Sequence, residues 1–284
     1  MTLDGSSDPG RDRDLSRDDG ALDESHTNLM FDIQPLLDAW PYAPDELTAR
    51  RITGPDGVDK IQMRLELGVL QMNADGRPDG ERPDGFESLL EYYEHAKQCR
   101  EATRGTSRPF TLSPDDCARL RHESLLYYHR YLCLFCVGDF ARMARDTERN
   151  LRVSDFIRDN ALLPADRASL EPYRAYVIMM NIRARAGLAA EEGRFAHARG
   201  VIEDGIQRIE EALIGGGDAE EIPTSAEIRS LRELLAELDS ATPATEESAI
   251  EAALEEAIRR EDYLAAAEMR DRLFDLRGRP GSRD

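Results

Sequence analysis

The sequence predicts a mainly α-helical protein of packed helical hairpins, with one β-hairpin near its N-terminal end. Two observations lead to this fold class. From Phe86 onward, apolar residues recur at intervals of three and four, which is the spacing of one face of a helix. Between Ile61 and Val69, apolar and polar residues alternate strictly, and this period of two predicts a strand.

Composition restricts the classes of protein to which the chain belongs. A length of 284 residues with 40% hydrophobic content is enough for one or two folded domains. The formal net charge of −20 argues against direct binding to duplex nucleic acid, whose phosphates are neutralised by Lys and Arg. The longest apolar run, Tyr131 to Val137, is too short to cross a membrane, and the acidic N-terminus is unlike a signal peptide. We therefore expect a cytoplasmic protein.

The N-terminal part of the chain divides into two predicted segments. Residues 1–27 are acidic and nearly free of apolar side chains, which predicts a disordered tail that is either a solvated terminus or a partner-binding arm. Residues 28–85 are expected to hold a helix over residues 29–40 and a β-hairpin within residues 47–72. The turn of this hairpin is expected at Pro55-Asp56-Gly57, because Pro and Gly favour turns.

Two copies of Arg-Pro-Asp-Gly follow the strand and predict a stiff loop that displays Arg77 and Arg82 together. Arginine pairs bind carboxylates or phosphates, so a site for a ligand or an acidic peptide is one interpretation of the loop. An ordinary exposed loop is the other interpretation. The loop also suggests an alternative function, an enzyme of unknown reaction with a cleft near Arg77, Arg82 and His95.

Residues 86–240 are predicted to form a helical body. Helix starts are indicated where a capping residue precedes a helical stripe, and helix ends where a glycine follows one. The run Gly215-Gly216-Gly217 predicts a hinge. The expected helix starts are Ser113, Asp139, Asp166 and the pair Thr224 with Glu227.

Three junctions share a turn pattern, at residues 138–140, 193–195 and 261–263. In each, an aromatic residue begins the second helix and a small or slender residue follows three positions later, which predicts close packing on the preceding helix. The second junction resembles the turn of a tetratricopeptide repeat at Gly193, Phe195 and Ala198, although the repeat length is not regular. This resemblance implies repeat-like α-hairpins in the middle of the chain.

The cysteines give a weak indication of a metal site. Four cysteines are too sparse for a disulfide framework and suit a reducing compartment. Cys133 and Cys136 resemble half of a zinc site, and His122 and His129 fall on the same helical face as Cys133. However, no second CxxC or CxxH pair follows, and the apolar neighbours favour small buried side chains instead. We expect no metal site.

The last stretch, residues 241–284, is predicted to be a helical hairpin. Ser248 with Glu251 is a capping-box pattern that predicts the start of the first helix, and Asp262 is the expected N-cap of the second. So small a unit buries too little apolar surface to be stable alone. It must pack on the preceding helices, on another copy of itself or on a different protein. The plainer interpretation is the last helix pair of a helical domain.

A specific residue pattern marks this hairpin, in which an acidic pair and an aromatic residue precede Ala-Ala and Arg-Asp. Its members are Leu254, Ala257, Glu261, Asp262, Tyr263, Ala266, Ala267, Met269, Arg270, Asp271, Leu273 and Leu276. The pattern resembles the UVR motif of the UvrB and UvrC excision-repair proteins, with a departure at Leu264, where those proteins usually have Glu. In that family the motif is a protein-docking hairpin that pairs with a second copy, and similar motifs occur in Clp-type chaperone ATPases and their adaptors. The resemblance implies a partner that carries a UVR motif, or self-association.

The N-terminal segment extends the resemblance. The predicted strand at residues 60–72 is followed by an Asp-Gly-Arg-Pro-Asp-Gly loop at residues 75–80. This order is similar to that in a bacterial group of UVR-motif proteins. The resemblance would then cover most of the chain, but it implies no particular activity.

The sequence lacks the common motifs of nucleotide binding and catalysis: GxxxxGK[ST], the Rossmann glycine pattern, HExxH and GxSxG. We therefore expect no cofactor and a non-enzymatic interaction or adaptor protein. Excision repair, Clp-type proteolysis and stress adaptation are all open as its pathway.

The second helix of the hairpin is where we expect the partner to bind. Its apolar stripe is longer than the short first helix, Ile250 to Ile258, can cover, and an uncovered stripe indicates an interface. Arg270 and Asp271 are expected to orient the partner by complementary charge. The predicted partner-binding residues are Leu254, Tyr263, Ala266, Ala267, Met269, Arg270, Asp271, Leu273 and Leu276.

Overall fold

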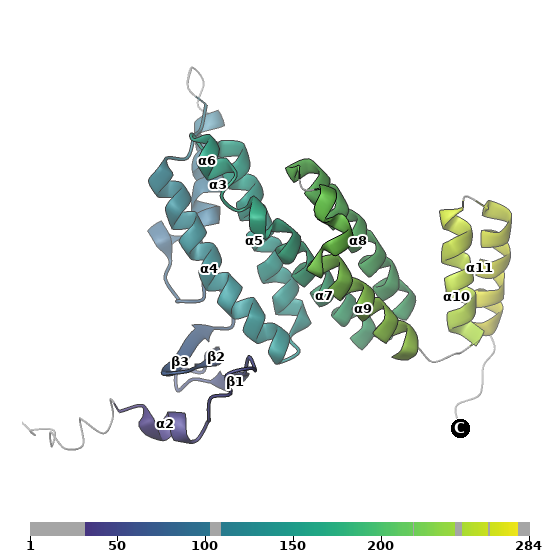
Figure 1. Ribbon diagram of the computed structural model, residues 1–284, viewed down its shortest axis with the longest axis horizontal. Coiled ribbons are helices and arrows are strands. Elements are labelled where there is room, and N and C mark those ends of the chain that lie inside the picture. Colours follow the sequence, from purple (N-terminus) through teal and green to yellow (C-terminus); the bar gives the residue numbers. More distant parts are fainter. Residues whose placement is uncertain (1–31, 103–108, 218, 242–245, 261, 278–284) are drawn as a thin grey trace, which may run out of the picture. The chain divides into compact units, whose positions relative to one another are not determined.

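The chain divides into two compact units, residues 1–42 and 43–284. The predicted disordered tail, residues 1–27, lies outside the described residues. In the first unit, the described residues include the short helix α2 (Gln34–Asp38), which covers only part of the helix predicted over residues 29–40. The computed structural model in Figure 1 describes residues 32–102, 109–217, 219–241, 246–260 and 262–277.

The second unit is mainly α-helical, as predicted, with a small sheet at its N-terminal end (Figure 1). Its strands are β1 (Ala49–Thr53), β2 (Asp59–Leu65) and β3 (Gly68–Asn73). Its α-helices are α3 (Leu89–Ala102), α4 (Pro114–Cys136), α5 (Phe140–Asn160), α6 (Pro164–Arg167), α7 (Arg174–Glu191), α8 (Phe195–Gly216), α9 (Ala226–Ala241), α10 (Glu246–Arg259) and α11 (Tyr263–Arg277). Short 3-10 helices are η1 (Pro83–Gly85), η2 (Glu171–Tyr173) and η3 (Ala219–Thr224).

The sheet is an antiparallel meander in the order β1-β2-β3, with one strand more than the predicted hairpin. The period of two that predicts one strand from Ile61 to Val69 is interrupted, because the chain turns between Leu65 and Gly68. Leu67 lies in this turn and is 87% exposed. Apolar and polar residues continue to alternate through this tight turn, so the sequence pattern does not reveal it. The prediction of one long strand is therefore wrong.

The two faces of β2 have different chemistry. Ile61 and Met63 belong to the main hydrophobic core, together with residues of α4, α5, α7, α8 and α9. On the other face, the Gln62 side chain accepts from Arg50 Nε at 2.8 Å and donates to Gln71 at 2.8 Å, which links the three strands. Both faces of the central strand are therefore covered, and the sheet packs on α4.

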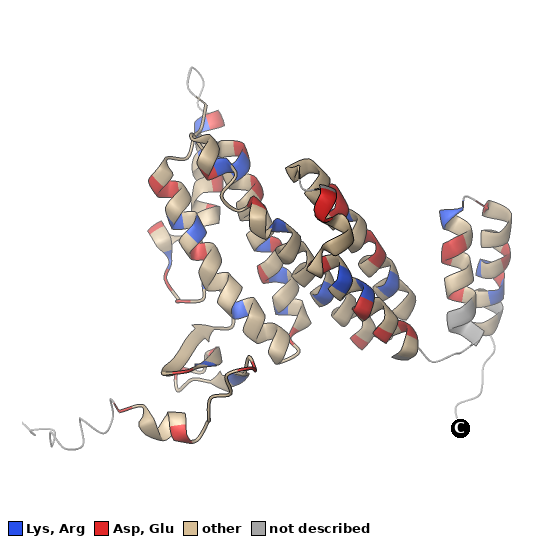
Figure 2. Cartoon of the chain, viewed as in Figure 1, with Lys and Arg blue, Asp and Glu red and all other residues tan. Residues whose placement is uncertain are grey.

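The helical body is a succession of packed helices, α4 on α5, α5 on α7, α7 on α8 and α8 on α9. Ser113 caps α4 through a reciprocal pair with Asp116, and Asp139 caps α5, both as predicted. Acidic and basic residues are interspersed along these helices (Figure 2). Some form ion pairs between neighbours, such as Arg199 on α8 with Asp239 on α9 at 3.0 Å.

The three junctions that share a sequence pattern also share a backbone hydrogen bond. The amides of Asp139, Arg194 and Asp262 each donate to the carbonyl five residues earlier, at 2.9 Å. At the first two junctions the preceding glycine has a positive φ, +71° at Gly138 and +73° at Gly193, which a residue with a side chain rarely adopts. The first two junctions are Schellman turns that join pairs of helices, as the mainly α fold prediction expects. The likeness to a tetratricopeptide repeat stays a prediction.

Two predicted helix starts and one predicted hinge are wrong. Asp166 does not begin a long helix, because Pro172 interrupts the path before α7 begins at Arg174. The glycine run is no separate hinge, since α8 continues to Gly216 and ends at Gly217. The start of α9 is held by Ser225, whose Oγ accepts from the Ile228 amide at 3.3 Å, instead of by Thr224.

Small residues allow two of the helix crossings to be close. A Cβ on Gly187 of α7 would lie 2.9 Å from the ring of Phe140, and one on Gly205 of α8 would lie 2.5 Å from Ile182 Cγ1. Ile182 on α7 is fully buried, so its side chain cannot move away from an added methyl group without disturbing its neighbours. The crossing of α7 and α8 therefore requires glycine at position 205.

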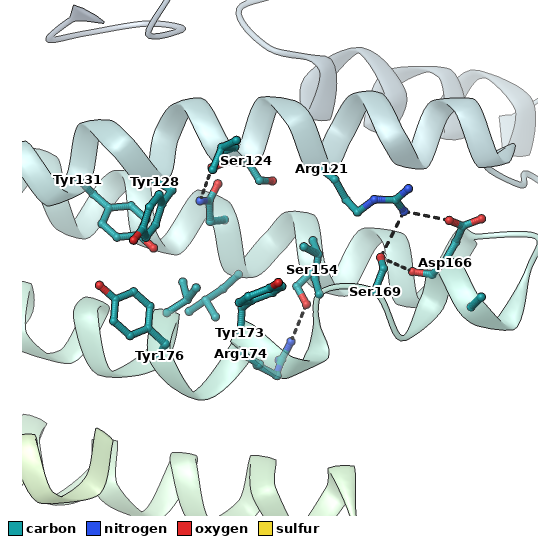
Figure 3. A pocket seen from close by; sticks show the side chains of 16 residues that line it. Arg121, Ser124, Tyr128, Tyr131, Ser154, Asp166, Ser169, Tyr173, Arg174 and Tyr176 are labelled. Atoms are coloured by element: carbon teal, nitrogen blue, oxygen red, sulfur yellow. Dashed lines mark hydrogen bonds and ion pairs between the residues drawn. The ribbon is translucent and has the colours of Figure 1, made fainter. Parts of the chain in front are cut away.

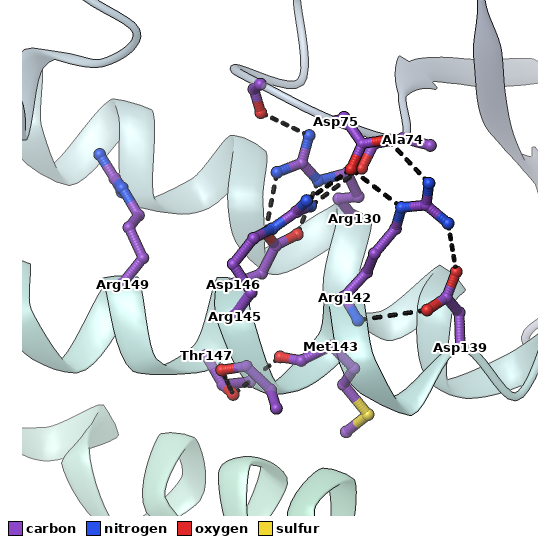
Figure 4. Close-up of polar contacts among 12 residues, drawn as sticks. Ala74, Asp75, Arg130, Asp139, Arg142, Met143, Arg145, Asp146, Thr147 and Arg149 are labelled. Carbon is purple, nitrogen blue, oxygen red and sulfur yellow. Dashed lines mark hydrogen bonds and ion pairs between the residues drawn. The ribbon is translucent and has the colours of Figure 1, made fainter. Parts of the chain in front are cut away.

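A buried ion pair holds the end of the sheet on the helical body. Arg130 on α4 and Asp146 on α5 are both fully buried and form two hydrogen bonds, at 2.6 and 2.8 Å (Figure 4). Arg130 Nη1 also donates to the carbonyls of Asn73 at 2.9 Å and Gly76 at 2.7 Å. One guanidinium thus joins α4, α5 and the loop after β3.

We expect Gly205→Ala to destabilise the protein by about 1–3 kcal/mol, because the new methyl group overpacks the contact with Ile182. Gly200→Ala, in the same helix but facing open space, is the matched control. It should stabilise the protein by about 0.5–1 kcal/mol through its helix propensity. Urea unfolding of the two variants measures both effects, and equal effects at the two positions would contradict the close crossing.

We expect Asp146→Leu to destabilise the protein by about 3–5 kcal/mol, because it leaves Arg130 charged and buried without its partner. The double variant Arg130→Met/Asp146→Leu removes both charges. Its loss of unfolding free energy should be smaller than the sum of the losses in the two single variants. Chemical denaturation of the three proteins measures this coupling, and strict additivity would show that the pair does not act as a unit.

Candidate functional site

The C-terminal hairpin has the predicted two-helix form. Asp262 caps α11, since its Oδ1 accepts from the Ala265 amide at 3.2 Å. The first helix, α10, begins at Glu246 instead of Ser248, and the side chain of Ser248 lies outside the described residues. Ile250 on α10 is buried, and Arg259 forms an ion pair with Glu203 of α8 at 3.1 Å. The hairpin therefore contacts α8, an earlier helix of the same chain, and packing on earlier helices is one of the three kinds of support expected for so small a unit.

The structure separates the predicted partner-binding residues by exposure. Ala266 and Leu273 are buried, so the prediction that α10 is too short to cover this stripe is wrong for them. The longer α10 packs on α11 along this side. Leu254, Ala267, Met269 and Leu276 are half-buried, and Tyr263, Arg270 and Asp271 are exposed. Their role in binding a partner stays a prediction.

Helix α11 carries apolar residues on two opposite sides. At 3.6 residues per turn, the inner side holds Ala266, Met269, Leu273 and Leu276. The outer face, as we name it, covers about one third of the circumference and holds Tyr263, Leu264, Ala267, Arg270, Asp271 and Phe274.

The outer face exposes three large apolar side chains. Tyr263 is 72% exposed, Leu264 87% and Phe274 77%. Tyr263 is among the predicted partner-binding residues, whereas Leu264 and Phe274 are not, because that prediction follows a single apolar stripe. The spacing of Tyr263 and Phe274 in the sequence indicates this second apolar side. They are eleven residues, or about three turns, apart and therefore lie on the same side of the helix.

The loop between β3 and η1 is anchored to α5 by its acidic residue. Asp75 accepts from Arg142 Nε at 2.9 Å and Nη2 at 2.7 Å, and from Arg145 Nη1 at 2.6 Å (Figure 4). Arg145 also donates to the Ala74 carbonyl at 2.9 Å. Hydrogen bonds from Arg142, and then from Arg145, hold the pKa of Asp75 well below its usual range.

The two arginines of the Arg-Pro-Asp-Gly repeats are not displayed as a pair. Arg77 is nearly buried, with Nη2 at 3.0 Å from Asp79 and Nε at 3.5 Å from the buried Glu123. Arg82 donates to the carbonyl of Gly85 at 3.4 Å. Because carboxylates of the same chain neutralise Arg77, this loop is poorly suited to bind an anionic substrate.

A cavity of about 600 Å³ does lie beside Arg77, near the cleft expected for an enzyme. Arg119 and His122 line it in place of Arg82 and His95. His95 instead packs against the Phe86 ring at 5.2 Å between centroids. Arg119 and His122 are not among the predicted residues, because they lie on α4, a segment distant in the chain that packing brings beside the loop.

The residues weighed as metal ligands do not form a cluster. Cys133 is buried, and burial raises the pKa of its thiol to about 12, which keeps it protonated. Cys136 is exposed and its Sγ lies 3.4 Å from the Leu47 carbonyl. Across the described residues, no group of three or more His, Cys, Asp or Glu side chains could hold a metal ion.

Within the described residues, none of the helices combines the length and apolar character needed to cross a membrane.

Comparisons of the chain with known protein families, curated proteins and solved structures find no match. The resemblances to the UVR motif and to a tetratricopeptide repeat therefore rest on the residues of this chain alone. The UVR resemblance stays a prediction.

The ion pairs of Asp75 predict an acid-sensitive contribution to stability. A carboxyl whose pKa is lowered in the folded state stabilises the protein above its unfolded pKa, near 3.9, and loses this effect as the pH falls below it. Asp75→Asn should therefore cost about 1 kcal/mol or less at pH 7, since the pair is solvent-screened, and less at acidic pH. Urea unfolding at pH 7 and at a pH below the unfolded pKa tests this prediction. The control is Asp204→Asn, at an exposed aspartate. A cost for Asp75→Asn that does not change with pH would contradict the assignment.

Proposed function

We propose that the chain is a non-enzymatic interaction protein of the cytoplasm that binds a protein partner through the outer face of α11. The observation that carries the proposal is the exposure of Tyr263, Leu264 and Phe274 on one side of a single helix. Aromatic residues gathered in an exposed apolar patch are typical of protein interfaces. The four cysteines are free in the structure, which fits a reducing compartment.

The charges of the outer face favour a second copy of the hairpin as the partner. Arg270 and Asp271 are adjacent, both 70% exposed, and they pair with each other at 2.8 Å. In a two-fold symmetric dimer each contact occurs twice, so Arg270 of each copy could face Asp271 of the other. Such exposed pairs add little affinity, but they fix the register in which two apolar faces meet.

The resemblance to the UVR motif supports the same class of function. A partner with a UVR motif would offer a similar hairpin, so docking between different chains is the related possibility. The cavity beside Arg77 offers weaker support for an enzyme, because the guanidinium there is already held by Asp79 and Glu123.

We expect Leu264→Glu and Phe274→Glu to abolish self-association, because each places a charge in the apolar contact. Both side chains are exposed, so the fold of each variant should be unchanged. Sedimentation velocity of the full chain over a range of concentrations measures the association. The matched control is Leu67→Glu, which alters a leucine of the same exposure, 87%, in the turn after β2.

The expected result is a concentration-dependent dimer for the wild type and the control, and a monomer for the two α11 variants. A wild type that stays monomeric at every concentration would overturn self-association. The same variants then test a partner with a UVR motif in a binding assay. If Phe274→Glu binds that partner as well as the wild type does, docking through the outer face is wrong.

A further inference from the structure

A cavity of about 900 Å³ lies within the helical body. Residues of α4 and α7 form two of its walls, and Ser154 of α5 lies between them (Figure 3). Asn150 and Leu151 of α5 also line the cavity. Its size falls within the range of pockets that hold small-molecule ligands, about 300–1,000 Å³. The predicted function of the C-terminal hairpin makes no use of this cavity.

The connection between α5 and α7 lines one end of the cavity. The junctions at Gly138 and Gly193 are tight turns, whereas residues 161–173 form α6 and η2 and contribute Asp166, Ser169 and Tyr173 to the lining. Arg121 of α4 fastens this connection, since its Nη1 donates to Asp166 at 2.9 Å and to Ser169 at 3.3 Å.

Two arginines lie near this end, on opposite walls (Figure 3). Arg174, the first residue of α7, pairs through Nη1 with Asp155 at 2.8 Å and donates to Ser154 at 3.4 Å. Within the described part of the chain, the polar contacts of both Arg121 and Arg174 run through Nη1. Arg77 is nearly buried among Asp79, Glu81 and Glu123. In contrast, Arg121 and Arg174 are partly exposed and each pairs with one carboxylate, so their other N–H groups can donate to an anionic group of a ligand.

The other end of the cavity is aromatic. Tyr128 and Tyr131 of α4 pack edge to face with centroids 5.4 Å apart, and Tyr176 of α7 lies 6.3 Å from Tyr128 (Figure 3). Burial, together with Tyr128, raises the pKa of Tyr176 to about 12, so its hydroxyl is neutral at physiological pH. Neutral rings of this kind suit the apolar or aromatic body of a ligand.

We infer that this cavity binds a small amphipathic organic anion. Its carboxylate, sulfonate or phosphate group would lie at Arg121 and Arg174, and its apolar body would lie on the half-buried rings of Tyr128 and Tyr176. Two features distinguish this site from an ordinary groove between helices, the two arginines with further N–H groups at one end and the aromatic rings at the other.

Titration of the full chain with anilinonaphthalene sulfonate, a fluorescent aromatic anion, tests the inference. The expected result is saturable binding of one dye per chain, weakened about tenfold by Arg121→Gln, which removes a charge-assisted hydrogen bond. Tyr173→Ala, at a side chain that lines the cavity and is 63% exposed, should also weaken binding. Thermal unfolding shows whether each variant is folded. If Arg121→Gln destabilises the protein, because Arg121 also bonds to Asp166 and Ser169, Arg174→Gln takes its place in the test.

Controls separate this cavity from other sites. Arg208→Gln, at an exposed arginine of α8, and Tyr263→Ala, on the outer face of α11, should leave the affinity unchanged. The uncharged analogue N-phenylnaphthylamine should bind wild type and Arg121→Gln equally, since it has no anionic group. Equal dye affinity in the wild type, Arg121→Gln and Tyr173→Ala would overturn the proposal, as would loss of dye binding in Tyr263→Ala. Neither result would affect the docking role proposed for α11.

Discussion

The buried pair of Arg130 and Asp146 is the contact on which the arrangement of sheet and helices depends. Two charged groups removed from water are costly unless each is fully hydrogen-bonded. Here Asp146 receives two hydrogen bonds from Arg130 and one from Arg145, at 3.0 Å. Arg130 in turn binds two carbonyls of the loop after β3. Its hydrogen bonds are complete only when α4, α5 and that loop are in place, so the pair favours one arrangement of these elements over others.

Two of the connections in the helical body are the same tight turn, and the connection between α5 and α7 is longer and irregular. The Schellman turns at Gly138 and Gly193 reverse the chain within a few residues, so α4 with α5 and α7 with α8 form hairpins. The longer connection at residues 161–173, which contains Pro164 and Pro172, cannot form such a turn. It contributes to the lining of the cavity between α4 and α7 instead, so the irregular connection between two regular hairpins creates the ligand site that we infer.

The terminal hairpin shows how one helix can serve stability and binding together. The inner side of α11 packs on α10, which supplies the apolar contact that a short helix needs. The outer face keeps Tyr263, Leu264 and Phe274 in solvent. Large exposed apolar side chains add nothing to the stability of the isolated chain, and for this reason they favour a role in docking.

The sequence by itself determined the mainly α fold, the caps at Ser113, Asp139 and Asp262, and the glycine turns, because these depend on contacts between residues close in the chain. Only the tertiary structure decided which apolar side of α11 is covered, since helical periodicity places residues on faces but does not say which face has a neighbour. The same holds for the cavities, where Arg121 meets Asp166 and Arg77 meets Glu123 across long stretches of sequence. Side chains distant in the chain are brought together by packing, which one sequence does not record.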